Sequence, residues 1–259
     1  MIPAWDAERW ITDNDRIRTR TTHDLPGLFA AVRPLRDVSV RRLLDIGCGF
    51  GGLAKLVGES IGAAEIHGVD IDPQVFDEAR SKGVEAVLVD AEQDALPYPD
   101  EHFDVIMTLG IMDQMPAFDG LLREINRVLA PGGHVLVSLP NLASWHNRMM
   151  LLLGYQPRDV EISREVLVGV PACYAGHEPD GHIHIPTLRA FTELMEHHGF
   201  ARVQLSRGRP LVRSVHPVLR LVDSVLTRRV SLARRFYYLG SKQRIGPAAG
   251  GTPIRPPSP

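Results

Sequence analysis

The stretch "LLDIGCGFGGLAKLVGE", residues 43–59, places four glycines in a six-residue loop directly after an apolar run. The run before the loop has the composition of a buried strand, and the residues after it have that of a helix. Glycines in such a turn indicate that something must approach the backbone closely. Gly47, Gly49 and Gly52 also satisfy the spacing G-x-G-x-x-G, so a dinucleotide enzyme is one reading of the pattern.

Outward from this turn, short apolar runs alternate with helical patterns as far as residue 140. Further strands are expected at 65–70, 84–90, 103–109 and 134–140, with helices at 51–61, 73–83 and 118–133. Such alternation implies a parallel sheet that is covered by helices on both faces. The chain is therefore predicted to be an α/β protein.

After residue 140 the periodicity loosens. Helical spacing returns at 142–154, 186–200 and 215–227, and strands are expected at 201–207 and 234–242. The segment 155–183 has few periodic signals, which favours a functional lid over a neutral loop. We predict an N-terminal helical arm (1–40), a main domain (41–245) that includes a lid region (140–185), and a disordered Pro/Gly-rich tail (246–259).

Composition narrows the class of protein. A hydrophobic content of 44% and a charged content of 23% are typical of globular domains. A net charge of −2 gives no reason to expect nucleic acid as a partner. The two cysteines, Cys48 and Cys173, argue against a disulfide scaffold or a zinc cluster and suit a reducing cytoplasm. No apolar run reaches the roughly 18 residues of a membrane span.

The charge is distributed unevenly along the chain. Residues 1–199 contain 17 Lys/Arg and 30 Asp/Glu, whereas residues 200–259 contain 12 and 1. Two parts of one surface that complement each other would explain this split. A basic patch for an anionic substrate or a membrane surface is the other interpretation, and the arginine-rich segment 207–235 has the apolar periodicity of a lipid-surface helix.

Three acidic positions decide which ligand the glycine loop serves. Asp45 lies two residues before Gly47, where it would repel a pyrophosphate but attract a cationic group, unless it caps the helix. Asp70 ends the second strand, where an acid accepts hydrogen bonds from a ribose diol. Asp90 ends the third strand, within reach of an adenine amino group, or is a surface acid.

The motifs "LLDIGCGFGG", "GVDID", "VDAEQDALPYPDEHFDVIM" and "INRVLAPGGHVLVSLPN" resemble those of class I S-adenosylmethionine (SAM)-dependent methyltransferases of the ubiquinone/menaquinone-biosynthesis type. The resemblance implies a Rossmann-like, doubly wound, seven-stranded sheet whose last strand is antiparallel. It also implies SAM as the cofactor. The residues it places around the cofactor are Asp45, Gly47, Cys48, Gly49, Gly51, Asp70, Ile71, Asp90, Ala91 and Leu109.

Candidates for catalysis lie after the fourth strand and in the lid region. Related enzymes often carry a histidine where this chain has Gln114. Asp113, the residue before it, could act as a general base, bind an ammonium group or cap a helix. His182 and His184 would point to the same side of an extended segment. His184 is the preferred general base. A metal held by this histidine-rich loop is the less favoured reading, and we expect none.

Residues 135–195 are also similar to a methionine-biosynthesis branch of methyltransferase-like proteins. This similarity implies that Asn141, Trp145 and Arg148 stand at the mouth of a substrate pocket. Tyr174, in the same histidine-rich stretch, is a further substrate-binding candidate.

The sequence therefore predicts a cytoplasmic SAM-dependent methyltransferase that acts on a small molecule. The acceptor atom is oxygen, nitrogen or carbon, and the expected role is in the biosynthesis of a specialised metabolite. The alternatives are a quinone or lipid-linked acceptor, with membrane contact, and a non-catalytic partner that keeps the fold. The oligomeric state stays open.

Overall fold

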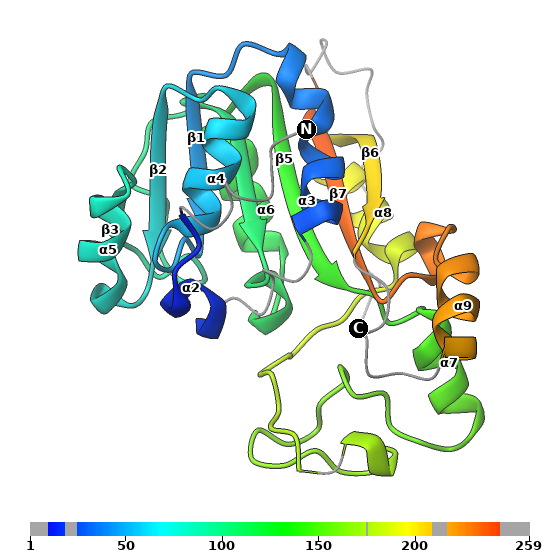
Figure 1. Cartoon of the computed structure of the whole chain (residues 1–259). Helices are drawn as coiled ribbons and strands as arrows, with labels where there is room; N and C mark the ends of the chain where they lie inside the picture. Colours follow the sequence, from blue (N-terminus) through cyan, green and yellow to red (C-terminus); the bar gives the residue numbers. More distant parts are fainter. Residues whose placement is uncertain (1–9, 19–24, 175, 209–216, 244–259) are drawn as a thin grey trace, which may run out of the picture.

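The computed structural model describes residues 10–18, 25–174, 176–208 and 217–243, and its centre is a seven-stranded sheet (Figure 1). The strand order is β3-β2-β1-β4-β5-β7-β6. Strand β7 runs antiparallel to both β5 and β6, while the first five strands are parallel. The predicted fold is confirmed. The strands are β1 (Arg42–Ile46), β2 (Glu65–Asp70), β3 (Glu85–Leu88), β4 (Phe103–Leu109), β5 (Leu129–Pro140), β6 (Phe200–Arg207) and β7 (Arg235–Lys242).

Helices cover both faces of this sheet. Consecutive residues of β1 point to opposite faces, so Leu43 joins one hydrophobic core and Leu44 joins the other. Side chains of α3, α4 and α5 fill the first core, and those of α6 and α8 fill the second. The α-helices of the described residues are α2 (Asp13–Arg18), α3 (Leu25–Val32), α4 (Gly52–Ile61), α5 (Phe76–Ser81), α6 (Asp119–Val128), α7 (Trp145–Leu152), α8 (Leu188–His197) and α9 (Pro217–Leu226).

Two expected helices are shorter than the sequence pattern suggests. The element expected at 73–83 begins as a 3-10 turn, Pro73–Val75, and the Asp72 side chain caps this turn by accepting a hydrogen bond from the Gln74 amide. The helix expected at 118–133 ends at Val128. The Pro-Gly stretch after it continues as the start of β5 rather than as a helix end.

The lid region contains α7 and a 3-10 turn at Ala172–Tyr174, and the rest of its described residues have no regular helix or strand apart from the end of β5. The lid region lies beyond the carboxyl ends of the parallel strands, at the bottom of the view in Figure 1. This position fits a lid, which stays a prediction. The predicted disordered tail lies outside the described residues.

The N-terminal arm is joined to the glycine loop by a buried ion pair. The Asp15 carboxylate accepts hydrogen bonds from the Gly52 amide (3.0 Å) and from Lys82 Nζ (2.7 Å). Lys82 also donates to Glu78 (2.8 Å) and to the Phe50 carbonyl (2.9 Å). Asp15 and Lys82 are both buried. An acid of the arm thus occupies the amino end of α4, where the helix dipole favours negative charge.

Replacing Lys82 with Met should destabilise the protein by about 3–5 kcal/mol, because Asp15 would remain as a buried carboxylate without its cation. Urea unfolding at pH 7 measures the change. Lys55→Met is the matched control, since the Lys55 ammonium lies 3.6 Å from the exposed Glu59, and it should cost about 1 kcal/mol or less. Equal losses in the two variants would contradict the assignment.

Candidate functional site

The glycine loop lies at the carboxyl ends of the central strands. Strand β1 sits between β2 and β4, so the connections leaving it and those leaving β4 run to opposite sides of the sheet. In open parallel sheets this switch point forms the crevice where ligands bind. The residues that follow β1, β2 and β4 therefore form the candidate site.

The glycines of the loop are required by its own packing. Gly47, Gly49 and Gly51 have φ angles of 79°, 50° and 77°, a region that disfavours side chains. A Cβ atom on Gly47 would lie 2.3 Å from Ile111, and one on Gly51 would lie 3.0 Å from the Ala79 Cα. The sequence expectation attributed these glycines to a ligand alone. The structure adds that protein atoms already occupy the space beside two of them.

Asp70 is oriented by backbone amides. Its Oδ2 accepts a hydrogen bond from the Gly49 amide (2.9 Å), and its Oδ1 accepts one from the Asp72 amide (3.0 Å). The loop is held to the same strand, because the Gly47 and Cys48 amides donate to the Val69 carbonyl. Carboxylate oxygens accept more than one hydrogen bond each, so these two amide bonds are compatible with hydroxyl donors at Asp70.

Asp45 is a buried carboxylate whose charge is not compensated by its surroundings. Among the described residues, no hydrogen bond or ion pair reaches its carboxylate. Burial, and secondarily the nearby charge of Asp70, raises the pKa of Asp45 well above its usual range. An ionised carboxylate in such a place is costly unless a cation joins it. The site therefore suits a ligand with an ammonium group beside Asp45 and hydroxyl groups beside Asp70, as the amino acid and ribose of SAM provide.

Other predicted cofactor residues lie at the carboxyl ends of β1, β2 and β4. Ile71 follows Asp70 directly and is largely exposed, and Leu109 ends β4 at the same edge of the sheet. The Cys48 side chain is buried in the core, so that only its backbone belongs to the loop surface. Its sulfur lies within 2.6 Å of where a Cβ on Gly68 would stand, which explains the glycine in β2.

Asp90 organises the turn after β3. Its carboxylate accepts hydrogen bonds from the Glu92 amide and the Gln93 side chain, both at 3.0 Å. Ala91 is half-buried and packs against the second core. Both residues lie near the β2 end, since the Val89 amide donates to the Asp70 carbonyl.

Asp113 and His182 come together beyond β4. The buried Asp113 carboxylate lies 3.4 Å from His182 Nε2 and 3.8 Å from Arg235 Nη2. Burial raises the pKa of Asp113, and the positive charges of Arg235 and His182 oppose that rise. The Asp113 carbonyl accepts hydrogen bonds from the Ile183 and His184 amides, which ties the lid region to the end of β4.

His182 and His184 have different surroundings. The second ring nitrogen of His182, Nδ1, lies 3.7 Å from Glu161, whose carboxylate accepts hydrogen bonds from the amides of residues 180–182. The His184 side chain is exposed, and its ring lies edge-on to Phe118. The geometry thus favours the Asp113–His182 pair over His184, the base preferred from the sequence.

The Asn141 side chain is committed to the fold. It is fully buried, and its Nδ2 donates to the Ser231 and Ala233 carbonyls while its Oδ1 accepts from the Ala143 amide. These bonds join the end of β5 to the segment before β7. Because every polar atom of the side chain is used, Asn141 does not stand at a pocket mouth as expected.

The other substrate candidates lie on or near α7. Trp145 Nε1 donates to Asp223 at 2.7 Å, and the exposed Arg148 donates to the Ala143 carbonyl. Tyr174 lines a small cavity between α7 and the loop that follows it. The cavity is lined by His146, Asn147, Met150, Arg158, Asp159, Tyr174 and Arg234.

The pair of Asp159 and Arg234 in this cavity was missed by the sequence reasoning. Arg234 Nη2 lies 2.8 Å from Asp159 Oδ1, and its Nε lies 3.3 Å from Oδ2. Burial alone would raise the pKa of Asp159, but the Arg234 charge and hydrogen bonds lower it to about 2. The partners are 75 residues apart, so no local motif could indicate the pair.

Within the described residues, Asp159, Asp180 and His182 have ligand atoms within 4.8 Å of one another. Arginines already compensate these carboxylates, because Arg158 lies 2.5 Å from Asp180 and Arg234 pairs with Asp159. The two carboxylates of this cluster are thus paired with arginine guanidinium groups.

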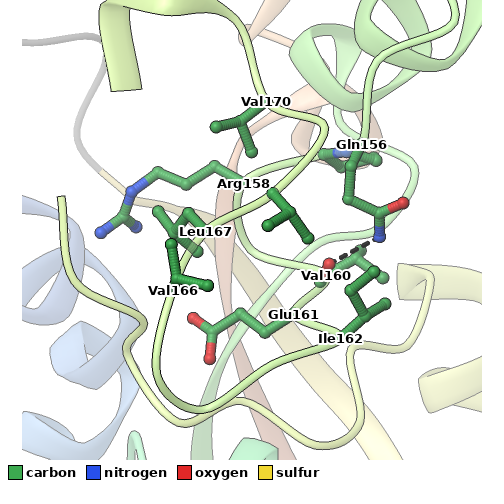
Figure 2. A pocket seen from close by; sticks show the side chains of 10 residues that line it. Gln156, Arg158, Val160, Glu161, Ile162, Val166, Leu167 and Val170 are labelled. Atoms are coloured by element: carbon green, nitrogen blue, oxygen red, sulfur yellow. Dashed lines mark hydrogen bonds between the residues drawn. The ribbon is translucent and has the colours of Figure 1, made fainter. Parts of the chain in front are cut away.

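A second hollow lies inside the lid region itself. Figure 2 shows its walls, which are formed mainly by apolar side chains such as Val160, Ile162, Val166 and Leu167. The Gln156 side chain donates to the Val160 carbonyl at 2.6 Å and closes the turn. Arg158 and Glu161 add charge to these walls, and Glu161 connects them to His182.

Fold and site together define a class I methyltransferase architecture. A family described as "Methyltransferase domain" matches residues 17–205, and the chain belongs to that family. The resemblance to class I SAM-dependent methyltransferases is confirmed. A SAM-dependent methyltransferase from Archaeoglobus fulgidus shares the fold with a TM-score of 0.57 and 17% identity, over 93% of this chain and 100% of the other.

The chain is also similar to several curated methyltransferases. The chain is 30% identical to phthiotriol/phenolphthiotriol dimycocerosates methyltransferase of Mycobacterium leprae, over 66% of this chain and 65% of the relative. It is 34% identical to fatty-acid O-methyltransferase of Mycolicibacterium smegmatis, over 42% and 40%. It is 36% identical to demethylmenaquinone methyltransferase of Thermus thermophilus, over 44% and 54%. The matched region thus spans less than two thirds of each of these relatives.

Replacing Arg234 with Met should destabilise the protein by about 2 kcal/mol at pH 7, because Asp159 would lose the partner that lowers its pKa. In the wild type, this stabilisation is complete above about pH 4 and is lost as the pH falls toward 2. In the variant, the buried Asp159 would protonate at higher pH, so the difference should shrink between pH 7 and pH 3.5. Urea unfolding across this range measures both effects.

Arg189→Met is the control for this measurement, because Arg189 forms an exposed pair with Glu193 on α8. It should change stability little at any pH. A loss in Arg234→Met that does not depend on pH would show that packing, rather than the charge of Asp159, determines it.

Proposed function

We propose that this protein transfers a methyl group from SAM to an acceptor with a long apolar chain. The observation that carries the proposal is the buried Asp45 carboxylate beside the glycine loop, which lacks a cation among the described residues. A pyrophosphate-bearing cofactor would bring further negative charge to this place. A cofactor with an ammonium group supplies the charge that the site needs.

In this proposal Asp45 binds the ammonium group of SAM, and the amino-acid part of SAM lies beside the glycine loop. Asp70, held by the Gly49 and Asp72 amides, accepts hydrogen bonds from the ribose hydroxyls. Ile71 covers the adenine ring, with Asp90 and Ala91 at its edge. Leu109 borders the sulfur.

SAM, when bound, supplies a methyl group on a positively charged sulfur, which is electrophilic without further activation. The protein then has to orient the acceptor and hold its proton. We assign this role to Asp113 and His182, which lie 3.4 Å apart beyond β4. His182 would take the acceptor proton, and the Asp113 carboxylate would orient the ring and stabilise its positive charge. The buried position of both groups excludes water while the lid region is closed.

The acceptor class is supported by the relatives and by the lid region. Two relatives are named for a fatty acid and for phthiotriol dimycocerosates, and the third is named for demethylmenaquinone. The lid region also exposes apolar side chains, such as Ile162 and Val166, which would contact an aliphatic chain. These observations favour the lipid or quinone alternative over the small polar metabolite, without selecting the acceptor atom.

Replacing Asp45 with Asn should weaken SAM binding by roughly 10- to 100-fold, because a charge-assisted contact of about 1.5–3 kcal/mol would be lost. Binding of 5′-methylthioadenosine, which lacks the amino-acid part, should be unchanged. Wild-type affinity for SAM should also fall at acidic pH, because Asp45, with its raised pKa, protonates there. The variant should lose this pH dependence. Calorimetric titrations measure the affinities for SAM and for 5′-methylthioadenosine, and the pH dependence of SAM binding in the wild type and the variant.

Asp70→Ala is the matched variant, because it acts on the ribose shared by both ligands and should weaken both. Asp77→Ala, an exposed acid on α5, is the control and should bind as the wild type does. The proposed cofactor site would be wrong if Asp45→Asn bound SAM normally, or if neither the wild type nor any variant bound SAM.

Transfer of radiolabelled methyl groups from SAM to a panel of long-chain acids, lipid-linked alcohols and prenylated quinols tests turnover. With an acceptor that needs deprotonation, His182→Gln should lower kcat by roughly 10²- to 10⁴-fold and leave SAM binding unchanged. His184→Gln is the control and should retain most of the rate. A larger loss of kcat in His184→Gln than in His182→Gln would assign the role of general base to His184. If no acceptor of the panel were labelled, the result would favour a non-catalytic partner protein.

A further inference from the structure

Helices α7 and α9 lie side by side beyond the carboxyl edge of the sheet, at the lower right of Figure 1. Their contact is polar. The fully buried Asp223 of α9 accepts a hydrogen bond from Trp145 Nε1 (2.7 Å) and lies 3.4 Å from His146 Nε2. At the end of α9, Thr227 accepts a hydrogen bond from Arg207 at 2.9 Å.

This anchoring turns the apolar side of α9 outward. Val218, Leu221, Val222 and Val225 follow the i, i+3, i+4, i+7 spacing of one helix face, and all four are exposed. Leu221 is 65% exposed. Asp223, on the other side of the helix, is the one buried residue of α9. An amphipathic helix normally packs its apolar face on the protein, so the orientation of α9 leaves that face for another partner.

Helix α7 extends the same exposed apolar area. Leu152 is 76% exposed, and Met149, Leu151 and Leu153 are exposed as well. We call the exposed apolar residues of α7 and α9, together with Leu153, the apolar–basic surface, because exposed arginines accompany them. These arginines are Arg148, Arg220, Arg228 and Arg229.

The charge of this surface has one sign. Residues 141–158 contain no Asp or Glu, and the one acid in residues 217–235 is the buried Asp223. A second copy of the chain that met this surface with its own identical surface would present the same positive charges and be repelled. The segments 209–216 and 244–259 contain arginines and no acid, so their charge does not complement the surface either.

We propose that the apolar–basic surface docks on an anionic lipid bilayer. Apolar side chains on one face of a helix enter the boundary between head groups and acyl chains, while adjacent cations bind anionic head groups. Both requirements are met here by exposed residues of α7 and α9. The inference concerns where the protein binds, and it holds whether or not the proposed acceptor is correct.

Co-sedimentation with sucrose-loaded vesicles tests the proposal. The full chain should bind vesicles of equimolar phosphatidylglycerol and phosphatidylcholine at least tenfold more strongly than vesicles of phosphatidylcholine alone. Raising the salt from 50 to 500 mM should weaken the binding to the anionic vesicles, because the interaction between arginines and head groups is screened. Equal binding to the two vesicle types, or no binding, would overturn the proposal.

Two double variants separate the contributions of charge and apolar area. Arg228→Gln with Arg229→Gln, and Leu152→Ser with Leu221→Ser, should each weaken binding to anionic vesicles about tenfold or more. All four residues are exposed, so the fold should be unaffected. SAM titration by calorimetry checks this, and unchanged SAM affinity in both variants separates a membrane defect from a failure of the cofactor site.

Control variants remove arginines or an apolar side chain elsewhere on the exposed surface. Arg36→Gln with Arg123→Gln removes two exposed arginines, and Val38→Ser removes an exposed apolar side chain. Both should bind anionic vesicles as the wild type does. If the controls lost as much binding as the variants of α7 and α9, attraction would be nonspecific and the surface assignment wrong. A dimer that Leu221→Ser dissociates, with no vesicle binding, would show instead that a second copy covers the surface.

Discussion

Close packing around the glycine loop is the constraint on which the site depends. Gly47 leaves room for Ile111 from the segment after β4, and Gly51 leaves room for Ala79 of α5. The Gly52 amide is held by Asp15 of the N-terminal arm. One turn of six residues therefore joins the arm, β1, α4, α5 and the end of β4. A side chain at Gly47 or Gly51 would displace protein atoms before it met any ligand, so the glycines serve the fold as well as the cofactor.

The parts of the structure that follow local rules could be predicted from the sequence. The parallel part of the sheet and the bounds of β2 and β4 agree with the apolar runs, because buried parallel strands leave a continuous hydrophobic pattern. The antiparallel last strand was implied by the family resemblance instead. Element ends were less accurate where backbone bonding overrides composition. Thus Pro131 and Gly132 lie inside β5, although the pair resembles a helix stop.

The polar groups beyond β4 could be predicted only in part, because long-range pairing determines them. His182 and Asp113 were both candidates, but their contact depends on the path of the lid region. Asn141 was expected at a pocket mouth from the similarity to the methionine-biosynthesis branch, yet its side-chain amide donates to carbonyls about 90 residues away. Asp159 and Arg234 carry no local motif at all. In each case the partner, rather than the residue type, decides the role.

The uneven charge of the chain has two explanations, and each holds for different residues. Some cations of the C-terminal part turn inward. Arg234 pairs with Asp159, and Arg235 lies near Asp113, so they complement acids of the N-terminal part. Arg220, Arg228 and Arg229 stay exposed beside apolar side chains. Since the inward arginines pair with Asp159 and Asp113, the exposed arginines are not needed by those acids, and an external anionic surface would attract them.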